Sequence, residues 1–215
     1  MRLTYLFDPL CGWCYGAAPA LDWIARSGTV TLELAPTGLF AGDGGQPMDA
    51  AFAEYVWQND ERIARQTGQP FSEAYRTLIF GSPGVAFDST AATLGLVAIG
   101  LTRPGHEAEG LRALQMARYV GARDTAERTV VADVLAGAGF PEAAARLVEP
   151  DAALREANRH RIEAAILMMT QFGVRGVPSL VLADDRGARR LPGGILFGDR
   201  HRLAAELRAG SEEAP

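Results

Sequence analysis

Hydrophobic residues near the start of the chain follow two different periods. A short aliphatic and aromatic run, Leu3–Phe7, predicts a buried strand. Over Cys14–Ser27, alanine, leucine and isoleucine recur at helical spacing, and Gly28 ends that pattern. Thr29–Pro36 then alternates apolar and polar residues and is rich in β-formers, which favours a second strand. The chain is therefore expected to open as β-α-β.

The middle of the chain is helical in pattern. Gly38–Pro47 contains four glycines and a proline and predicts a loop. Ser89 and Thr125 are suited to cap helix N-termini, because their hydroxyls can accept backbone N–H groups. Seven helices are expected, over Met48–Thr67, Phe71–Phe80, Ser89–Leu101, Glu107–Val120, Thr125–Ala136, Pro141–Leu147 and Asp151–Phe172.

The pattern changes again near the end of the chain. Val177–Ala183 is rich in β-formers, Asp184–Gly187 predicts a turn, and Ala188–Leu191 predicts a short strand. These two strands are close enough in sequence to form a hairpin. A last helix is expected over Asp199–Arg208, with Asp199 as its N-cap.

Composition and charge narrow the class of protein. Of the 215 residues, 48% are hydrophobic and 22% charged, which is typical of a globular chain. The 21 basic residues, all arginine, are scattered among 26 acidic ones, so no nucleic-acid footprint is expected. No apolar run is long enough for a membrane span. The N-terminus lacks a secretory signal, so a cytoplasmic location is expected.

The two cysteines form a Cys-x-x-Cys motif between the first strand and the first helix. Unpaired N–H groups and the helix dipole would stabilise a thiolate on Cys11 there. The two intervening residues, Gly12 and Trp13, let one helical turn bring the sulfurs together. We expect Cys11 to be exposed and to attack a disulfide, and Cys14 to resolve the mixed disulfide.

Two other uses of the motif are disfavoured. A zinc site would need two more ligands, but there is no second Cys-x-x-Cys, and His106, His160 and His201 stand far apart. No metal is therefore expected. An inert structural disulfide would close almost no loop and would add little stability.

The stretch from Cys11 to Pro19 resembles the active-site turn of the thioredoxin superfamily. In that superfamily a proline five residues after the second cysteine kinks the active-site helix, and the resemblance gives Gly12 and Pro19 structural roles. Taken by itself, Pro19 is also compatible with a helix that starts later and holds it in the first turn.

A second match is the run Gly-Val-Pro-Ser at 176–179. Thioredoxin-like proteins carry a cis-proline there, beside the cysteines, so the resemblance implies a cis Val177–Pro178 bond supported by Gly176. It also implies that the Val177 backbone pairs with an extended substrate segment. From the residues alone, Pro178 would be a trans proline at the start of a strand.

The long helical segment between these motifs resembles the insertion of DsbA-like proteins. Kappa-class glutathione transferases and 2-hydroxychromene-2-carboxylate isomerases carry similar insertions. The chain resembles the DsbA-like group of predicted cytoplasmic protein-disulfide isomerases, near the FrnE-type proteins. The resemblance implies an α/β thioredoxin-like fold, with a discontinuous domain (1–45 and 173–215) interrupted by a helical domain (46–172).

The activity that follows from this resemblance is thiol–disulfide exchange on protein or peptide substrates. Cys11 and Cys14 would form the redox centre, without a tightly bound cofactor, and Trp13, Val177 and Pro178 would bind substrate. Glutathione or a thioredoxin-type reductant would exchange electrons with it. Trp13 would be either an exposed substrate platform or a lid on the inserted domain. Because Gly-Trp replaces the Pro-His of DsbA, a less oxidising couple is expected.

Two rival functions stay open at this point. One is a glutathione-dependent transferase or isomerase of the kappa-like branch, which would not need Cys14. The other is a peptide-binding chaperone that makes no use of redox chemistry. Removal of Cys14 separates the first rival from disulfide exchange, and removal of both thiols separates the second.

Overall fold

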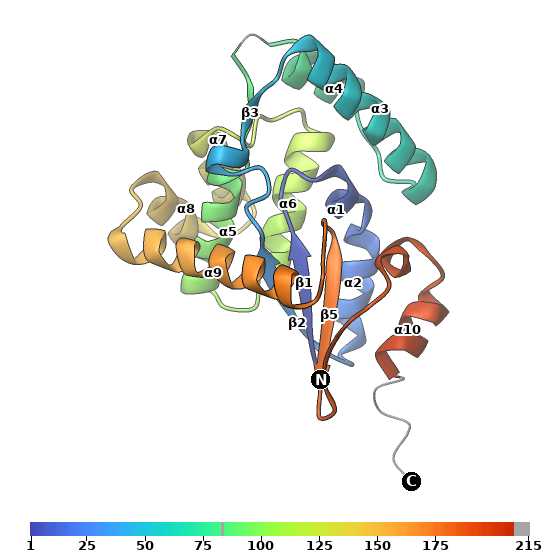
Figure 1. Cartoon of the computed structure of the whole chain (residues 1–215). Coiled ribbons are helices and arrows are strands. Elements are labelled where there is room, and N and C mark those ends of the chain that lie inside the picture. The colour runs from blue at the N-terminus through green and yellow to red at the C-terminus, as the bar shows by residue number, and fades with distance from the viewer. Residues whose placement is uncertain (83, 209–215) are drawn as a thin grey trace.

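The computed structural model describes residues 1–82 and 84–208 of the chain (Figure 1). At its centre is a four-stranded sheet in the order β2-β1-β5-β6, in which only β1 and β2 are parallel. The elements in chain order are β1 (Arg2–Phe7), α1 (Gly12–Gly16), α2 (Ala18–Ser27), β2 (Thr31–Pro36), η1 (Gly42–Gly44), β3 (Gln46–Pro47), α3 (Ala50–Thr67), α4 (Glu73–Phe80), β4 (Ala86–Phe87), α5 (Thr90–Thr102), α6 (Glu107–Tyr119), α7 (Arg128–Gly137), α8 (Pro141–Val148), α9 (Ala152–Gln171), β5 (Ser179–Asp184), β6 (Gly187–Arg190), η2 (Gly193–Phe197) and α10 (Arg200–Arg208).

The opening β-α-β unit and the final hairpin are present as predicted, with one difference in the first helix. Instead of one helix over Cys14–Ser27, a single turn, α1, ends at Gly16, and α2 begins after Ala17. Pro19 lies in the first turn of α2, where its missing N–H removes no helical hydrogen bond. The helix break therefore lies just after the cysteines: one helical turn precedes it and Pro19 follows it, an arrangement that agrees with both interpretations of Pro19.

The end of the chain also agrees with the expectation. The Val177–Pro178 bond is cis, as the resemblance implied. β5 starts at Ser179, two residues later than predicted, and pairs with β6 in the expected hairpin. The Asp199 carboxylate accepts a hydrogen bond from the backbone N–H of His201 at 2.9 Å, just ahead of α10.

Alternate residues of the sheet face two different layers of helices. Tyr5 of β1 belongs to a large core that includes Ile24 of α2 and Leu203 of α10. Leu6, the next residue of β1, packs instead with Ala165 of α9. In Figure 1, α2 and α10 accordingly lie to one side of the sheet and α9 crosses the other. These two layers enclose β1 on both faces, and the cysteines follow directly after that strand.

The inserted helices surround α5. Every residue of α5 from Ala91 to Ile99 is buried, which suits a helix that is apolar on all sides. It contacts α6, α7, α8 and α9. Helices α3 and α4 extend over the end of the sheet where α1 lies (Figure 1), and α3 contacts α1 directly. The insertion therefore covers the cysteine motif.

Two local predictions differ from the structure, the first only at its last two residues. The loop expected over Gly38–Pro47 contains the short strand β3, which pairs with β4, and this pairing depends on residues far apart in sequence. Thr125 caps no helix, because α7 begins at Arg128 with Glu127 at the N-cap position. Ser89 does hold the N-cap position of α5, but its hydroxyl bonds elsewhere.

The division of the chain into two domains stays a prediction. Buried residues of the sheet and of the inserted helices form one continuous core. Helix α9, assigned to the insertion by the 46–172 boundary, packs on the sheet through its C-terminal half. The final residues of the 173–215 segment, from 209 onward, lie outside the described residues.

Candidate active site

Cys11 and Cys14 lie at the two ends of the first turn of α1. Cys11 is the N-cap residue, and its sulfur accepts a hydrogen bond from the backbone N–H of Cys14 at 3.4 Å. The Cys11 N–H in turn donates to the Asp8 carbonyl at 3.1 Å. Both cysteines are free thiols here, so the structure corresponds to the reduced form. A thiolate on Cys11 would lie where the unpaired N–H groups of α1 point.

The exposure expected for Cys11 is wrong. Only 8% of Cys11 is exposed, and Cys14 is completely buried. The N-terminal turn is covered by the insertion and by the loop that carries the cis-proline, neither of which is near it in sequence. Cys11 is still more exposed than Cys14, as the motif predicted. A substrate must nevertheless reach Cys11 through a cavity.

The pKa of the Cys14 thiol is raised well above its ordinary value. Burial is the main cause, and the hydrogen bond and negative charge of Cys11 add to it. The backbone of Asp8 and, to a lesser extent, the Tyr5 hydroxyl have smaller effects in the opposite direction. Cys14 therefore stays protonated at neutral pH.

The cis-proline loop meets the nucleophile directly. The Cys11 thiol donates to the Val177 carbonyl oxygen at 3.6 Å, across 166 residues of sequence. Val177 and Pro178 are half-buried beside it. A Cβ at Gly176 would meet nothing within 4 Å, so close packing does not explain the glycine at that position. The structure thus brings the Val177 backbone to the thiol.

A buried carboxyl group supports the turn that leads into α1. Asp8 accepts hydrogen bonds from the backbone N–H groups of Leu10 and Phe40 and from the Ser89 hydroxyl, at 2.9, 3.1 and 2.8 Å. Burial nevertheless raises its pKa above the ordinary value. Asp8 thus caps this turn, and Ser89 ties it to the insertion.

A cavity of about 410 Å³ opens beside Cys11. It lies between the start of α1, the loop after β2, helix α3 and the cis-proline loop. Its lining is mostly apolar and aromatic, with polar groups along α3; it includes Leu10, Cys11, Gly12, Trp13, Leu39, Phe40, Gln46, Phe52, Tyr55, Val56, Asn59, Asp60, Arg62, Phe87, Gly176 and Val177.

The position of Trp13 bears on the two roles left open from the sequence, a substrate platform and a lid. It lines the cavity, as a substrate platform would. It also packs against both halves of the structure: its ring lies edge-on to Phe197 at 5.2 Å, and its indole N–H donates to Asn59 Oδ1 at 3.2 Å. The Arg62 guanidinium lies over the ring at 5.1 Å. Trp13 is therefore a fixed wall of the cavity.

Helix α3 supplies polar residues that the sequence analysis missed. Asp60 is 1% exposed and lies directly against α1: a Cβ on Gly12 would stand 2.5 Å from its Oδ1 atom. This contact explains why position 12 holds glycine, which has no Cβ. A signal was available, because Asp60 lies at helical spacing between Val56 and Ile63 on an otherwise apolar face.

Asp60 belongs to a buried polar group. Its Oδ2 accepts a hydrogen bond from the Tyr75 hydroxyl at 3.0 Å. Arg118, also fully buried, lies 5.8 Å from the Tyr75 ring and pairs with Asp124 at 3.4 Å. Burial raises the pKa of Asp60 to about 7, although Tyr75 and Arg118 both favour the ionised form. Asp60 therefore titrates near neutral pH.

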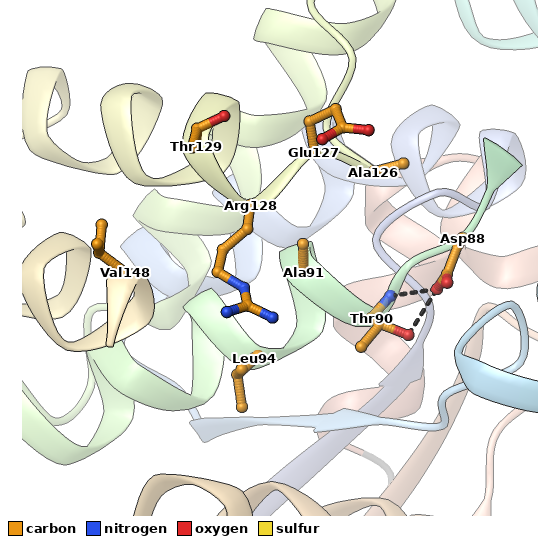
Figure 2. A pocket seen from close by; sticks show the side chains of 9 residues that line it. All are labelled: Asp88, Thr90, Ala91, Leu94, Ala126, Glu127, Arg128, Thr129 and Val148. Carbon is orange, nitrogen blue, oxygen red and sulfur yellow. Dashed lines mark hydrogen bonds between the residues drawn. The ribbon is translucent and has the colours of Figure 1, made fainter. Parts of the chain in front are cut away.

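A second cavity, of about 510 Å³, lies away from the cysteines near the N-terminal ends of α5 and α7 and the C-terminal end of α8 (Figure 2). Asp88 there accepts hydrogen bonds from the backbone and hydroxyl of Thr90. Arg128 extends across it toward Leu94. None of its charged side chains is buried, and it holds no thiol.

Two searches of the described residues complete the survey. No group of three or more histidine, cysteine, aspartate or glutamate side chains gathers in a way that could hold a metal ion. Within the same residues, no helix has the length and apolar character needed to cross a membrane.

A dithiol at a helix N-terminus, next to a cis-proline and a mixed sheet, defines a thioredoxin-like protein with an inserted helical segment. The model of the DSBA-like thioredoxin domain matches residues 2–200. The chain therefore belongs to the DSBA-like thioredoxin family, as the resemblance implied. No curated protein sequence matches it.

Solved structures agree with this assignment. The cytosolic disulfide reductase DsbM from Pseudomonas aeruginosa is 32% identical, with a TM-score of 0.86 over 97% of this chain and 100% of that one. DsbM with GSH matches with a TM-score of 0.83 over the same shares of the two chains. A candidate protein disulfide isomerase from Nitrosomonas europaea is 23% identical, with a TM-score of 0.75 over 97% of this chain and 95% of that one. A 2-hydroxychromene-2-carboxylate isomerase shares the fold at 16% identity, a TM-score of 0.64 and full coverage of both chains.

Proposed function

We propose that this protein is a thiol–disulfide oxidoreductase that reduces or isomerises disulfides of protein or peptide substrates in the cytoplasm. The observation that carries the proposal is the position of Cys11, at the N-cap of α1 with its sulfur beside the Val177 carbonyl. The likeness to DsbM, named as a cytosolic disulfide reductase, supports both the activity and the location.

The chemistry follows from the difference between the two thiols. The Cys11 thiolate attacks one sulfur of the substrate disulfide, forms a mixed disulfide and releases the other sulfur as a thiolate, which takes a proton from water. Bonding removes the negative charge of Cys11, which had helped to raise the pKa of Cys14. Cys14 then ionises more readily, attacks Cys11 and releases the second substrate thiol, leaving a Cys11–Cys14 disulfide.

The substrate segment is positioned by backbone as well as side chains. We propose that Val177 exchanges its contact with Cys11 for hydrogen bonds to an extended substrate, with Pro178 and Trp13 beside it. No tightly bound cofactor is required, because the dithiol carries both electrons. Two molecules of glutathione return the oxidised protein to the dithiol form and leave as one glutathione disulfide, which balances the electrons.

Two cysteine variants test this function. Cys11→Ser should abolish the reduction of insulin disulfides, since the attacking thiol is gone. Cys14→Ser should accumulate a mixed disulfide between Cys11 and the substrate, visible by mass spectrometry and removed by dithiothreitol. Full turnover by Cys14→Ser would contradict the proposal and favour the glutathione-transferase alternative. Binding without any exchange in the unaltered protein would favour the chaperone alternative.

A further inference from the structure

A carboxyl group of the insertion lies beside the first turn of α1, close to the nucleophile. Asp60 and Cys11 both line the cavity of about 410 Å³, and Gly12, the residue after Cys11, is in contact with the Asp60 side chain. Asp60 is 1% exposed and Cys11 is 8% exposed. Because water screens such buried charges weakly, a carboxylate on Asp60 and a thiolate on Cys11 should repel each other.

The Tyr119 hydroxyl lies within range of both groups. It donates to the carbonyl oxygen of Leu10, directly before Cys11, at 2.7 Å. Burial is the main cause of the raised pKa of Tyr119, and negative charges on Asp60 and on Cys11 both add to it. Two groups that act on the same buried hydroxyl also act on each other.

The helices packed against Asp60 supply one hydrogen bond and one positive charge. Tyr75 of α4 donates to its Oδ2 at 3.0 Å. Arg118 of α6 attracts the ionised carboxylate but pairs directly with Asp124. Burial outweighs both effects and raises the pKa of Asp60 to about 7. The charge of Asp60 therefore changes near neutral pH.

Other ionisable side chains near this turn are engaged elsewhere. On α3 itself, Glu61 accepts a hydrogen bond from the Trp57 indole N–H at 3.1 Å, and Arg62 donates to Asn59 at 2.9 Å. The buried carboxyl of Asp8 accepts hydrogen bonds from two backbone N–H groups and a hydroxyl. Among the residues that line the cavity, Asp60 supplies the carboxyl group.

We propose that the Asp60 carboxylate makes the Cys11–Cys14 dithiol a stronger reductant, because it repels the Cys11 thiolate and so favours the disulfide form. The inference rests on the proposed function. It adds a residue outside the Cys-x-x-Cys motif that acts through Cys11 and favours the transfer of electrons from the protein to its substrate.

Protons and electrons are coupled in this scheme. Two glutathione thiols reduce the protein disulfide to two thiols and leave as one glutathione disulfide. Cys14 keeps its proton, because burial raises its pKa. When Cys11 ionises, its thiolate draws a proton from water onto Asp60. Above the pH range in which Asp60 titrates, that proton is no longer bound, and the dithiol loses stability relative to the disulfide.

The test measures the equilibrium of the full-length protein with glutathione and glutathione disulfide at pH 5.5 and pH 8, by acid quench and mass spectrometry. Asp60→Asn keeps the side-chain size and an oxygen for Tyr75 but removes the charge. At pH 8 the equilibrium constant for reduction of the variant should be about tenfold larger than that of the unaltered protein, a potential about 30 mV less reducing. At pH 5.5, where Asp60 is protonated, the two constants should be equal.

Two further variants separate the charge from structural damage. Glu61→Gln removes one charge at the next position of α3, where the side chain is exposed and does not line the cavity, so both constants should stay unaltered. Tyr75→Phe removes the donor that favours the ionised form of Asp60, which should then stay protonated to higher pH. Its constant at pH 7 should lie between those of the unaltered protein and Asp60→Asn.

A titration of the reduced protein gives a second readout. The ultraviolet absorbance of the Cys11 thiolate, followed against pH, should reach its full value at a lower pH in Asp60→Asn than in the unaltered protein. The reason is that no neighbouring carboxylate then opposes the ionisation of Cys11. Glu61→Gln should follow the curve of the unaltered protein.

Two results would overturn the inference. One is an unchanged equilibrium constant in Asp60→Asn at pH 8. The other is the same change at both pH values, which would mean that the substitution acts through the packing of α3 on α1. Failure of the proposed function looks different, because then the unaltered protein would form no Cys11–Cys14 disulfide and would not reduce insulin. The thiolate titration needs no disulfide and would still test the effect of Asp60.

Discussion

Asp60 of the inserted helix α3 lies against Gly12, the first residue of the helix that carries the cysteines. A Cβ on Gly12 would stand 2.5 Å from Asp60 Oδ1 and 2.9 Å from the Ile63 side chain. The insertion and the thioredoxin-like motif therefore meet at the residue between the nucleophile and Trp13. Glycine permits this contact because it has no side chain.

Gly12→Ala should destabilise the protein. The added methyl group meets a carboxyl that Tyr75 holds in place, so α3 or α1 must shift, at a cost of about 1–3 kcal/mol. Chemical denaturation measures the change in the free energy of unfolding. Gly137→Ala, at the end of α7 where a Cβ meets nothing within 4 Å, is the control and should be neutral or stabilising. Equal effects of the two variants would contradict the contact.

The stability of the protein should depend on Asp60 and on pH. Its pKa rises from an ordinary value of 3.8 to about 7 on folding, so the folded state binds more protons between these values. The free energy of unfolding should therefore fall as pH rises through this range, by up to about 4 kcal/mol from this group. Asp60→Asn lacks this contribution.

The measurement is urea denaturation of both proteins at pH 5 and pH 8. Relative to the unaltered protein, Asp60→Asn should be more stable at pH 8 than at pH 5. Asp8 is present in both proteins, and its own titration cancels in the comparison. If the difference in the free energy of unfolding between the two proteins were the same at both pH values, Asp60 would not titrate in this range.

The two thiols of the reduced protein should react at very different rates. Cys14 is completely buried and its pKa is raised, so at pH 8 it stays protonated and shielded. Iodoacetamide should label Cys11 first, and mass spectrometry should show a singly labelled species. In denaturant both cysteines should react. Rapid double labelling of the native protein would contradict the burial of Cys14.

Ser89→Ala should destabilise the turn that leads into the cysteines. The variant removes the hydroxyl that donates to the buried carboxyl of Asp8 at 2.8 Å. The carboxyl then lacks one hydrogen-bond partner, which should lower the free energy of unfolding by about 1–3 kcal/mol. Thermal or chemical denaturation measures the loss. Ser82→Ala, which removes only a hydrogen bond to Leu78 within its own helix end, should cost less.

Much of the fold was predictable because its signals are local. Strand β1, the final hairpin and the order of the helices follow from the spacing of apolar residues and from glycine and proline positions. The β3–β4 pair was missed because two-residue strands have no period of their own. The break at Ala17, between α1 and α2, is compatible with both interpretations of Pro19.

The candidate site also has one part that the sequence predicted and one part that it did not. The sequence by itself determined the Cys11–Cys14 pair at a strand-to-helix junction and, through resemblance, the cis bond before Pro178, since both lie in short contiguous motifs. Only the tertiary structure decided that Cys11 is buried beside a cavity and that Asp60 and Arg62 line it. Those contacts join residues about fifty positions apart, and no local propensity encodes where two packed elements touch.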